Sequence, residues 1–210
     1  MSDALLRAES LGKLIRAVAL RLSSEQDAER IPELQLLIRV LAELGQIEPS
    51  YVVDEIKVQM PALEKLLPAA VFDEKTPGTL RSTVANLAQL AATVRDLISL
   101  DTWRIIRELN DEFQPVKTDD GFLDMLVKVD GLLASLAALT GQFAEGMTRT
   151  HAWRFLDFGR RLERTLQASQ LIRAVVAEGG GSDPAALESL LEVSDSLMTY
   201  RSRYYSRFQL

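Results

Sequence analysis

The stretch HAWRFLDFGRRLER, at residues 151–164, carries its apolar side chains at helical rather than strand spacing. Positions three, four and seven residues apart lie on one face of an α-helix. The stretch and its continuation are therefore expected to form one packing stripe, made of Phe155, Phe158, Leu162 and Leu166. Gly159 lies inside this stripe, where glycine costs a helix about 1 kcal/mol relative to alanine. A close approach by a second helix or a ligand would explain it.

An arginine–glutamate pair lies beside this stripe. A neighbouring face of the same helix carries Trp153, Leu156, Arg160 and Glu163. Because an unpaired buried charge is costly, these charges are expected to have partners, and a structural ion pair between helices is the commoner outcome. A binding or catalytic role for Arg160, Glu163 and Arg164 is the alternative, since perturbed charges cluster at functional sites.

Helical periodicity extends over nearly the whole chain, and the two-residue alternation typical of strands is hard to find. The pattern predicts helices at about 3–22, 32–45, 80–99, 102–114, 119–146 and 149–178, and a last helix from 184. Pro49, Pro61 and Pro68 are expected to divide residues 50–73 into short helical pieces. The fold class is therefore all-α, an antiparallel bundle of about seven main helices with short extra pieces.

Capping residues mark several of these helix ends. Thr79 or Ser82 is expected to cap the helix that begins near 80, and Asp101 is expected to cap the next one. Asp183 precedes a proline in the first turn of the last helix, which is a favourable N-terminal combination. Gly45 is a good C-terminal stop for the second helix.

Composition excludes several classes of protein. The 210-residue chain contains no cysteine, which rules out disulfides, thiolate catalysis and cysteine-based metal sites. Its net charge of −6 gives no electrostatic footprint for nucleic acid. Charged residues interrupt every apolar run well before about 18 residues, so no membrane span is expected. The N-terminal sequence MSDALLRAES lacks the basic lead and apolar run of a secretory signal, and we expect a cytoplasmic protein.

Neither a cofactor nor a metal site is indicated. His151 is the single histidine, lies near a helix start without a nucleophile motif, and is expected to be structural or incidental. The Glu-x-x-His pair of di-iron bundles is missing. Gly179–Gly181 lacks the following Lys-Ser/Thr of a phosphate loop and does not follow a strand, so it is expected to be a hinge or linker.

Positive charge gathers in two places on this acidic chain. Six arginines occur within 149–173, and Arg201, Arg203 and Arg207 accompany tyrosines near the C-terminus. Arginine binds phosphate and carboxylate in a bidentate manner, so an anion site is one interpretation. Docking to an acidic partner, such as the aspartate-rich stretch 119–130, is a second. Solvated or internally paired faces are the commoner explanation.

Three groups of residues together resemble the bacterial alpha-E domain family. They are Arg81 and Asn86 with VRDLIS at 94–99 and Trp103, HAWRFLDFGRRLER at 151–164, and YRSRY at 200–204. Their order and approximate spacing agree with that family over about residues 5–210. The Trp-x-Phe-Leu-x-x-Gly-Arg-x-Leu-Glu-Arg core of the second group is the most specific part.

The chain departs from the family pattern at both ends. The family has an N-terminal Leu-Gly-Arg-x-x-Glu-Arg-Ala-Glu helix, of which Arg7-Ala8-Glu9 remains, and Leu6 stands where its first glutamate would be. The family helices beyond the Tyr-Arg segment are absent, and the last helical pattern has no polar stop signal. We therefore expect residues 1–210 to be a single alpha-E-like helical domain, a fragment or short form of a longer protein.

The resemblance implies a setting rather than a reaction. Family members are fused to, or neighbour, circularly permuted ATP-grasp ligases and transglutaminase-like peptidases in peptide or amide synthesis systems. LEVSDSLMTY at 191–200 is similar to the forms fused behind an ATP-grasp region. The expected function is an accessory helical domain that binds the substrate or partner in an ATP-grasp-linked peptide or amide synthesis or modification system.

Two alternatives remain open beside this function. One is an enzyme domain that uses the Arg/Glu cluster at 160–164 in amide chemistry, and the other is a purely structural or oligomerisation bundle. The expected partners are an ATP-grasp ligase region, fused or separate, and a peptide substrate. The candidate binding residues are Arg160, Glu163, Arg164, Arg95, Trp153 and Arg201. The sequence assigns no catalytic residue.

Overall fold

The computed structural model describes residues 1–23, 32–47, 60–115, 121–177 and 183–204. Within these ranges the chain forms nine α-helices and no strand, which confirms the all-α class. The helices are α1 (Ser2–Ser23), α2 (Pro32–Glu43), α3 (Met60–Val71), α4 (Leu80–Thr93), α5 (Leu100–Glu112), α6 (Gly121–Glu145), α7 (His151–Ala177), α8 (Pro184–Val193) and α9 (Leu197–Tyr204), with a short 3₁₀ turn, η4 (Arg95–Leu97). None of them combines the length and apolar character needed to cross a bilayer.

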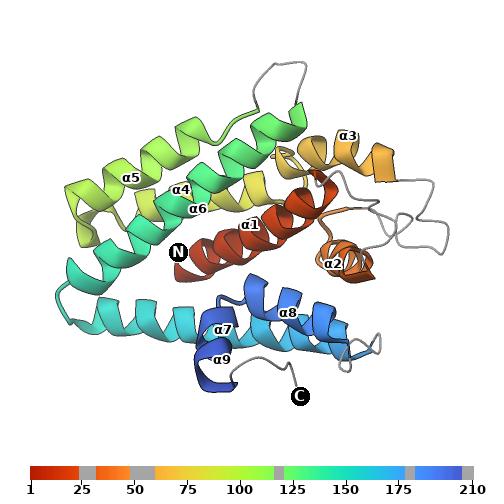
Figure 1. Ribbon diagram of the computed structural model, residues 1–210. Coiled ribbons are helices and arrows are strands. Elements are labelled where there is room, and N and C mark those ends of the chain that lie inside the picture. Colours follow the sequence, from red (N-terminus) through yellow and green to blue (C-terminus); the bar gives the residue numbers. More distant parts are fainter. Residues whose placement is uncertain (24–31, 48–59, 116–120, 178–182, 205–210) are drawn as a thin grey trace.

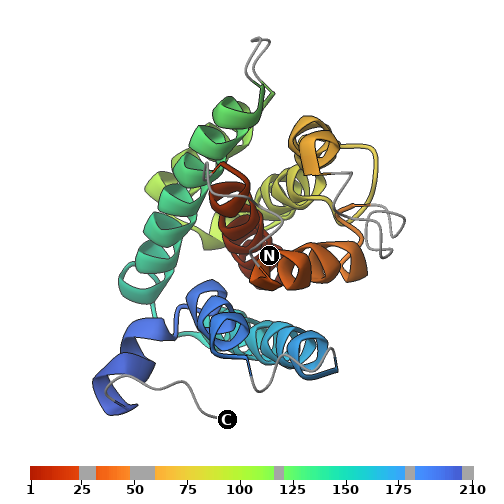
Figure 2. The same ribbon diagram turned by 45° about the vertical axis from the view of Figure 1, so that its right-hand side comes forward.

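Helix α1 occupies the centre of the bundle. It lies between α4 and α6 on one side and α7 and α8 on the other, with α2 alongside (Figures 1 and 2). Its sequence explains this position, because apolar or small residues cover most of its circumference rather than a single stripe. The remaining helices pack outside this inner set: α5 packs on α4 and α6, α3 packs on α6, and α9 packs on α8.

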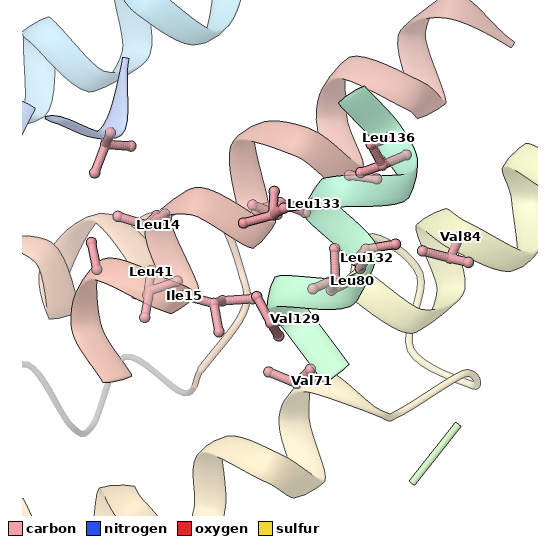
Figure 3. Close-up of a cluster of buried hydrophobic side chains, with 14 of the residues drawn as sticks. Leu14, Ile15, Leu41, Val71, Leu80, Val84, Val129, Leu132, Leu133 and Leu136 are labelled. Carbon is pink, nitrogen blue, oxygen red and sulfur yellow. The ribbon is translucent and has the colours of Figure 1, made fainter. Parts of the chain in front are cut away.

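The buried core is one cluster to which helices α1 to α8 all contribute, mostly with leucine, isoleucine, valine and alanine side chains. Figure 3 shows Ile15 of α1 close to Val129 of α6, with Leu41 of α2 beside it. Val71 of α3 and Leu80 of α4 close the same cluster. All five are at most 2% exposed, so the core is continuous across both sides of α1.

The capping residues define the helix ends largely as expected. Thr79 Oγ1 accepts a hydrogen bond from the Ser82 amide at 3.2 Å, and Asp183 caps α8 in the same way. Gly45 has a φ of +70°, and the amide after it bonds back to the Leu41 carbonyl, which is the Schellman arrangement. The prediction for Asp101 is wrong. Ser99 caps α5 instead, because its hydroxyl reaches the Thr102 amide at 3.1 Å and Asp101 falls within the first turn.

Three helix boundaries differ from the sequence prediction. Helix α3 continues through Pro68 to Val71, because Leu63, Leu67 and Val71 are buried and hold it on the core despite one missing hydrogen bond. Helix α4 ends at Thr93 rather than near 99. The expected last helix is broken into α8 and α9 at Asp195, whose φ is +54°, a left-handed conformation that aspartate tolerates. The predicted pieces around Pro49 and the linker Gly179–Gly181 lie outside the described residues.

The predicted packing stripe of α7 is wrong. Phe155, Phe158, Leu162 and Leu166 are 77%, 65%, 51% and 51% exposed. The neighbouring face, with Leu156, Glu163 and Leu171, is buried instead. Gly159 lies against the start of α1, where a β-carbon would overlap the Ser2 hydroxyl. Glycine therefore permits the close approach of a second helix at this position, as the sequence suggested.

Candidate functional site

A groove of about 360 Å³ opens between α1, α2, α7 and α8. Its apolar lining consists of Leu11, Leu14, Val40, Leu44, Leu166, Leu171 and Val193. Its polar lining consists of Arg7, Ser10, Glu43, Gln46, Glu163, Gln167, Gln170 and Arg173. Apolar and polar side chains thus line the groove in similar numbers, and a hollow in which polar groups converge beside an apolar surface is a candidate binding site.

Glu163 lies at the α7 wall of the groove with three polar partners around it. Gln167, one turn further along α7, donates a hydrogen bond from Nε2 to Glu163 Oε1 at 2.8 Å. Arg7 of α1 places Nε 3.5 Å from the same oxygen, and its Nη2 lies 3.2 Å from Asp3 Oδ1. Asp3 also shares a hydrogen bond with Glu163. We call Asp3, Arg7, Glu163 and Gln167 the carboxyl cluster.

Burial raises the pKa of Glu163, and the hydrogen bond and negative charge of Asp3 raise it further. The Gln167 hydrogen bond and the Arg7 guanidinium lower the pKa of Glu163, but these effects are smaller. The net effect is a raised pKa, so Glu163 keeps its proton up to a higher pH in the folded protein than in the unfolded chain. The carboxyl cluster thus sets two acids around one guanidinium where α1 meets α7.

This pKa shift predicts how pH changes stability. The pKa of Glu163 is raised above its ordinary 4.5, so the stability that its protonated carboxyl contributes is fully present below that pH. This stability is lost as pH rises through the pKa of Glu163 in the folded protein. Over this window the wild type should therefore become less stable relative to Glu163→Gln. Urea unfolding from about pH 4 to about pH 8 measures the difference.

Asp3→Asn provides the matched variant for this measurement. It removes the negative charge and the carboxyl hydrogen bond of Asp3, both of which raise the pKa of Glu163, so the pH dependence assigned to Glu163 should shrink. A difference between Glu163→Gln and wild type that stays constant over the whole pH range would contradict the assignment.

A second ion pair crosses the rim of the groove. Arg173 Nη2 of α7 lies 3.6 Å from Glu43 Oε2 of α2, and the two side chains are 75% and 47% exposed. Exposed pairs contribute little to stability, because water and salt screen them. Either side chain can therefore leave this ion pair and bind a ligand instead, with little loss of stability.

The six candidate binding residues predicted from the sequence do not lie together in the structure. Among the described residues, the groove lining includes Glu163 but not Arg160, Arg164, Arg95, Trp153 or Arg201. The ion pair of Glu163 is made with Arg7 of α1 rather than with Arg160, whose Nε is buried without a hydrogen-bond partner. Arg164 is exposed on α7.

The aromatic and C-terminal candidates have local partners. The guanidinium of Arg149 stacks over Trp153 at 4.1 Å and bonds to the Ala144 carbonyl, which holds the turn between α6 and α7. Arg95 lies over Trp103 at 5.5 Å in a shallow hollow beside α5. Arg201 pairs with Glu188 and joins α9 to α8. None of these contacts reaches the groove.

Several groove residues were not predicted from the sequence. Packing of α1, α2 and α7 brings together Arg7, Glu43 and Arg173, and no local sequence pattern indicates this arrangement. Gln167 was detectable, because it lies four residues after Glu163 and therefore on the same face. Within the described ranges, no three histidine, aspartate or glutamate side chains come together as metal ligands would.

Comparison with known proteins places the chain among bacterial relatives. Proteins of Mycobacterium bovis and of two Mycobacterium tuberculosis strains, all described as uncharacterised, are each 29% identical to it over 148 residues. The match covers 66% of this chain and 16% of each relative, so the chain spans about one-sixth of their length. A search of solved structures gave no significant match.

The family comparison covers nearly the whole chain. Residues 5–210 match the Alpha-E family, described as a predicted alpha-helical domain with a conserved ER motif. Glu-Arg pairs occur at 29–30 and 163–164, and the second stands in the stretch that carries Gly159 and the carboxyl cluster. With a helical structure throughout the described residues and a family match of this extent, the chain belongs to the Alpha-E family.

Proposed function

We propose that this domain is an accessory binding module whose groove takes a short peptide segment. The groove between α1, α2, α7 and α8 supports this function, because an apolar floor meets amide and charged side chains at one opening. A peptide presents the same mixture of apolar side chains, backbone amides and charges. We further propose that the segment belongs to the substrate or partner of an ATP-grasp-type ligase, which is the setting that the family resemblance implies.

The chemistry of the rim favours an acidic segment. Arg173 is the most exposed of the charged side chains that line the groove. A guanidinium can bind a carboxylate through two parallel hydrogen bonds. Gln170 offers an amide that both donates and accepts, which suits the backbone of a bound peptide. A carboxylate-bearing peptide is also the kind of substrate that an amide-forming ligase activates.

A groove-filling substitution tests the proposal. Gln170→Trp places a large ring at the exposed rim, and we expect affinity for short acidic peptides to fall at least about tenfold. Isothermal titration calorimetry with acidic peptides, and separately with an ATP-grasp ligase, measures the effect. Gln89→Trp, at an exposed position of α4 outside the groove, should leave binding unchanged. No heat with either ligand would overturn the proposal.

Amide chemistry at Glu163 is the second candidate, favoured by the raised pKa of a carboxyl that lines the groove. Glu163 is only 8% exposed, however, and Asp3, Arg7 and Gln167 already engage it. Arg160 and Arg164, which this alternative also needs, do not line the groove. Glu163→Gln separates the two functions, because a catalytic acid would lose turnover while peptide binding persisted.

A further inference from the structure

The outward face of α7 carries a continuous row of apolar side chains, which we call the α7 stripe: Phe155, Phe158, Leu162 and Leu166. They follow one another at spacings of three and four residues, so they form a line about 16 Å long on one side of the helix. Single exposed apolar residues are ordinary on a protein surface, whereas a contiguous row marks an interaction site.

Positive charge follows one edge of the α7 stripe. Arg154 and Arg161 are seven residues apart and each directly precedes a stripe residue, so both lie along the same side of the row. Arg154 is exposed and forms no ion pair with the part of the chain that the structure describes. Arg161 pairs with Asp157 at 2.9 Å, but its side chain remains 79% exposed. This edge is basic on a chain whose net charge is −6.

From this face we infer that the α7 stripe docks an amphipathic helix of a partner protein, with glutamate or aspartate bordering the helix's apolar face. An apolar row recognises the i, i+3, i+4 and i+7 side chains of such a helix, and the basic edge selects acidic flanks. Leu166 is the last residue of the α7 stripe and also lines the groove. The docked helix therefore ends beside the groove, although its binding does not depend on the proposed peptide function.

Charge complementarity disfavours a second copy of the chain as the occupant. An antiparallel pair of two copies would set Arg154 and Arg161 against their own equivalents, and a parallel pair offers them no exposed acid. An anionic membrane would also attract the two arginines, so vesicle binding is an outcome of the test below. A separate helix with acidic flanks meets both the apolar row and its basic edge.

The test uses two synthetic helical peptides of about 18 residues with the same leucine stripe, one flanked by glutamate and one by lysine. Fluorescence anisotropy should show tighter binding of the glutamate peptide to the whole domain. Phe158→Ser should weaken it at least tenfold, and Arg154→Glu with Arg161→Glu should reverse the preference between the peptides. These side chains are exposed, so the melting temperature should stay near that of the wild type.

Two controls separate this surface from others. Leu100→Ser removes an equally exposed leucine of α5 and should not change binding. Glu43→Trp, on the α2 side of the groove and off the α7 helix, should block the groove ligand but still bind the glutamate peptide, so the two proposals fail independently.

Four results would overturn the inference. They are no binding of either peptide, equal affinity for both, a dimer in light scattering that Phe158→Ser dissolves, and phosphatidylserine vesicle binding that Phe158→Ser abolishes. The third result would assign the α7 stripe to a second copy, and the fourth would assign it to a membrane.

Discussion

Replacing Ile15 by alanine is expected to lower the free energy of unfolding by about 3–4 kcal/mol. Ile15 is fully buried in the middle of α1, and α1 contacts helices on both sides of the bundle. Truncation removes apolar area and leaves a cavity that Leu41 and Val129 cannot both move to fill, because each is held by its own helix (Figure 3). The loss belongs at the upper part of the range for large-to-small substitutions.

Leu20→Ala is the matched control for this experiment. Leu20 lies on the same helix but is 46% exposed, so its truncation should change stability by about 0.5 kcal/mol or less. Urea denaturation of both variants gives the comparison directly. Similar losses for Ile15→Ala and Leu20→Ala would show that α1 does not occupy the centre of the bundle.

Arg81→Ala is expected to lower the free energy of unfolding by about 2–3 kcal/mol. Arg81 is 4% exposed and joins the start of α4 to the end of α5. Its Nη1 donates to the carbonyl and to the side-chain oxygen of Asn110 at 3.2 and 2.9 Å, and its Nε donates to Glu74 at 3.0 Å. Its removal leaves the Asn110 side-chain oxygen without its donor and the Asn110 carbonyl with only the longer bond from Gln114, and it opens a cavity beside them.

Arg81→Met keeps most of the side-chain volume but removes the hydrogen bonds. The difference in unfolding free energy between Arg81→Met and Arg81→Ala therefore measures the cavity, and the difference between the wild type and Arg81→Met measures the hydrogen bonds. Arg104→Ala is the surface control, because Arg104 is 66% exposed and its acidic partners lie 3.5 and 3.8 Å away. We expect that control to stay within about 0.5 kcal/mol of the wild type. Equal losses for Arg81→Ala and Arg104→Ala would contradict a structural role for Arg81.

Local chemistry accounts for the parts of the fold that the sequence predicted well. Thr79, Asp183 and Gly45 act within a few residues of their own position, so their types reveal the helix ends they make. Ser99 and Asp101 are both good caps, and the choice between them depends on where α5 meets α4, which the residue types do not contain.

Tertiary contacts decided what local reasoning could not. Helix α7 has two faces capable of packing, and the periodicity of Phe155 and Phe158 is as regular as that of the face actually buried. Packing of α7 on α1, α2 and α8 buries the second face and leaves the phenylalanines exposed. Glu163 could be nominated from its own helix, but its partners Asp3 and Arg7 come from the opposite end of the chain.

The central place of α1 has a consequence for how the nascent chain folds on the ribosome. Helix α1 is synthesised well before α6, α7 and α8, which cover it. At about 5–20 residues per second, synthesis from α1 to α7 takes on the order of ten seconds. During that interval, the leucine-rich surface of α1 lacks its final neighbours, which makes this helix a natural binding site for chaperones that recognise emerging apolar segments.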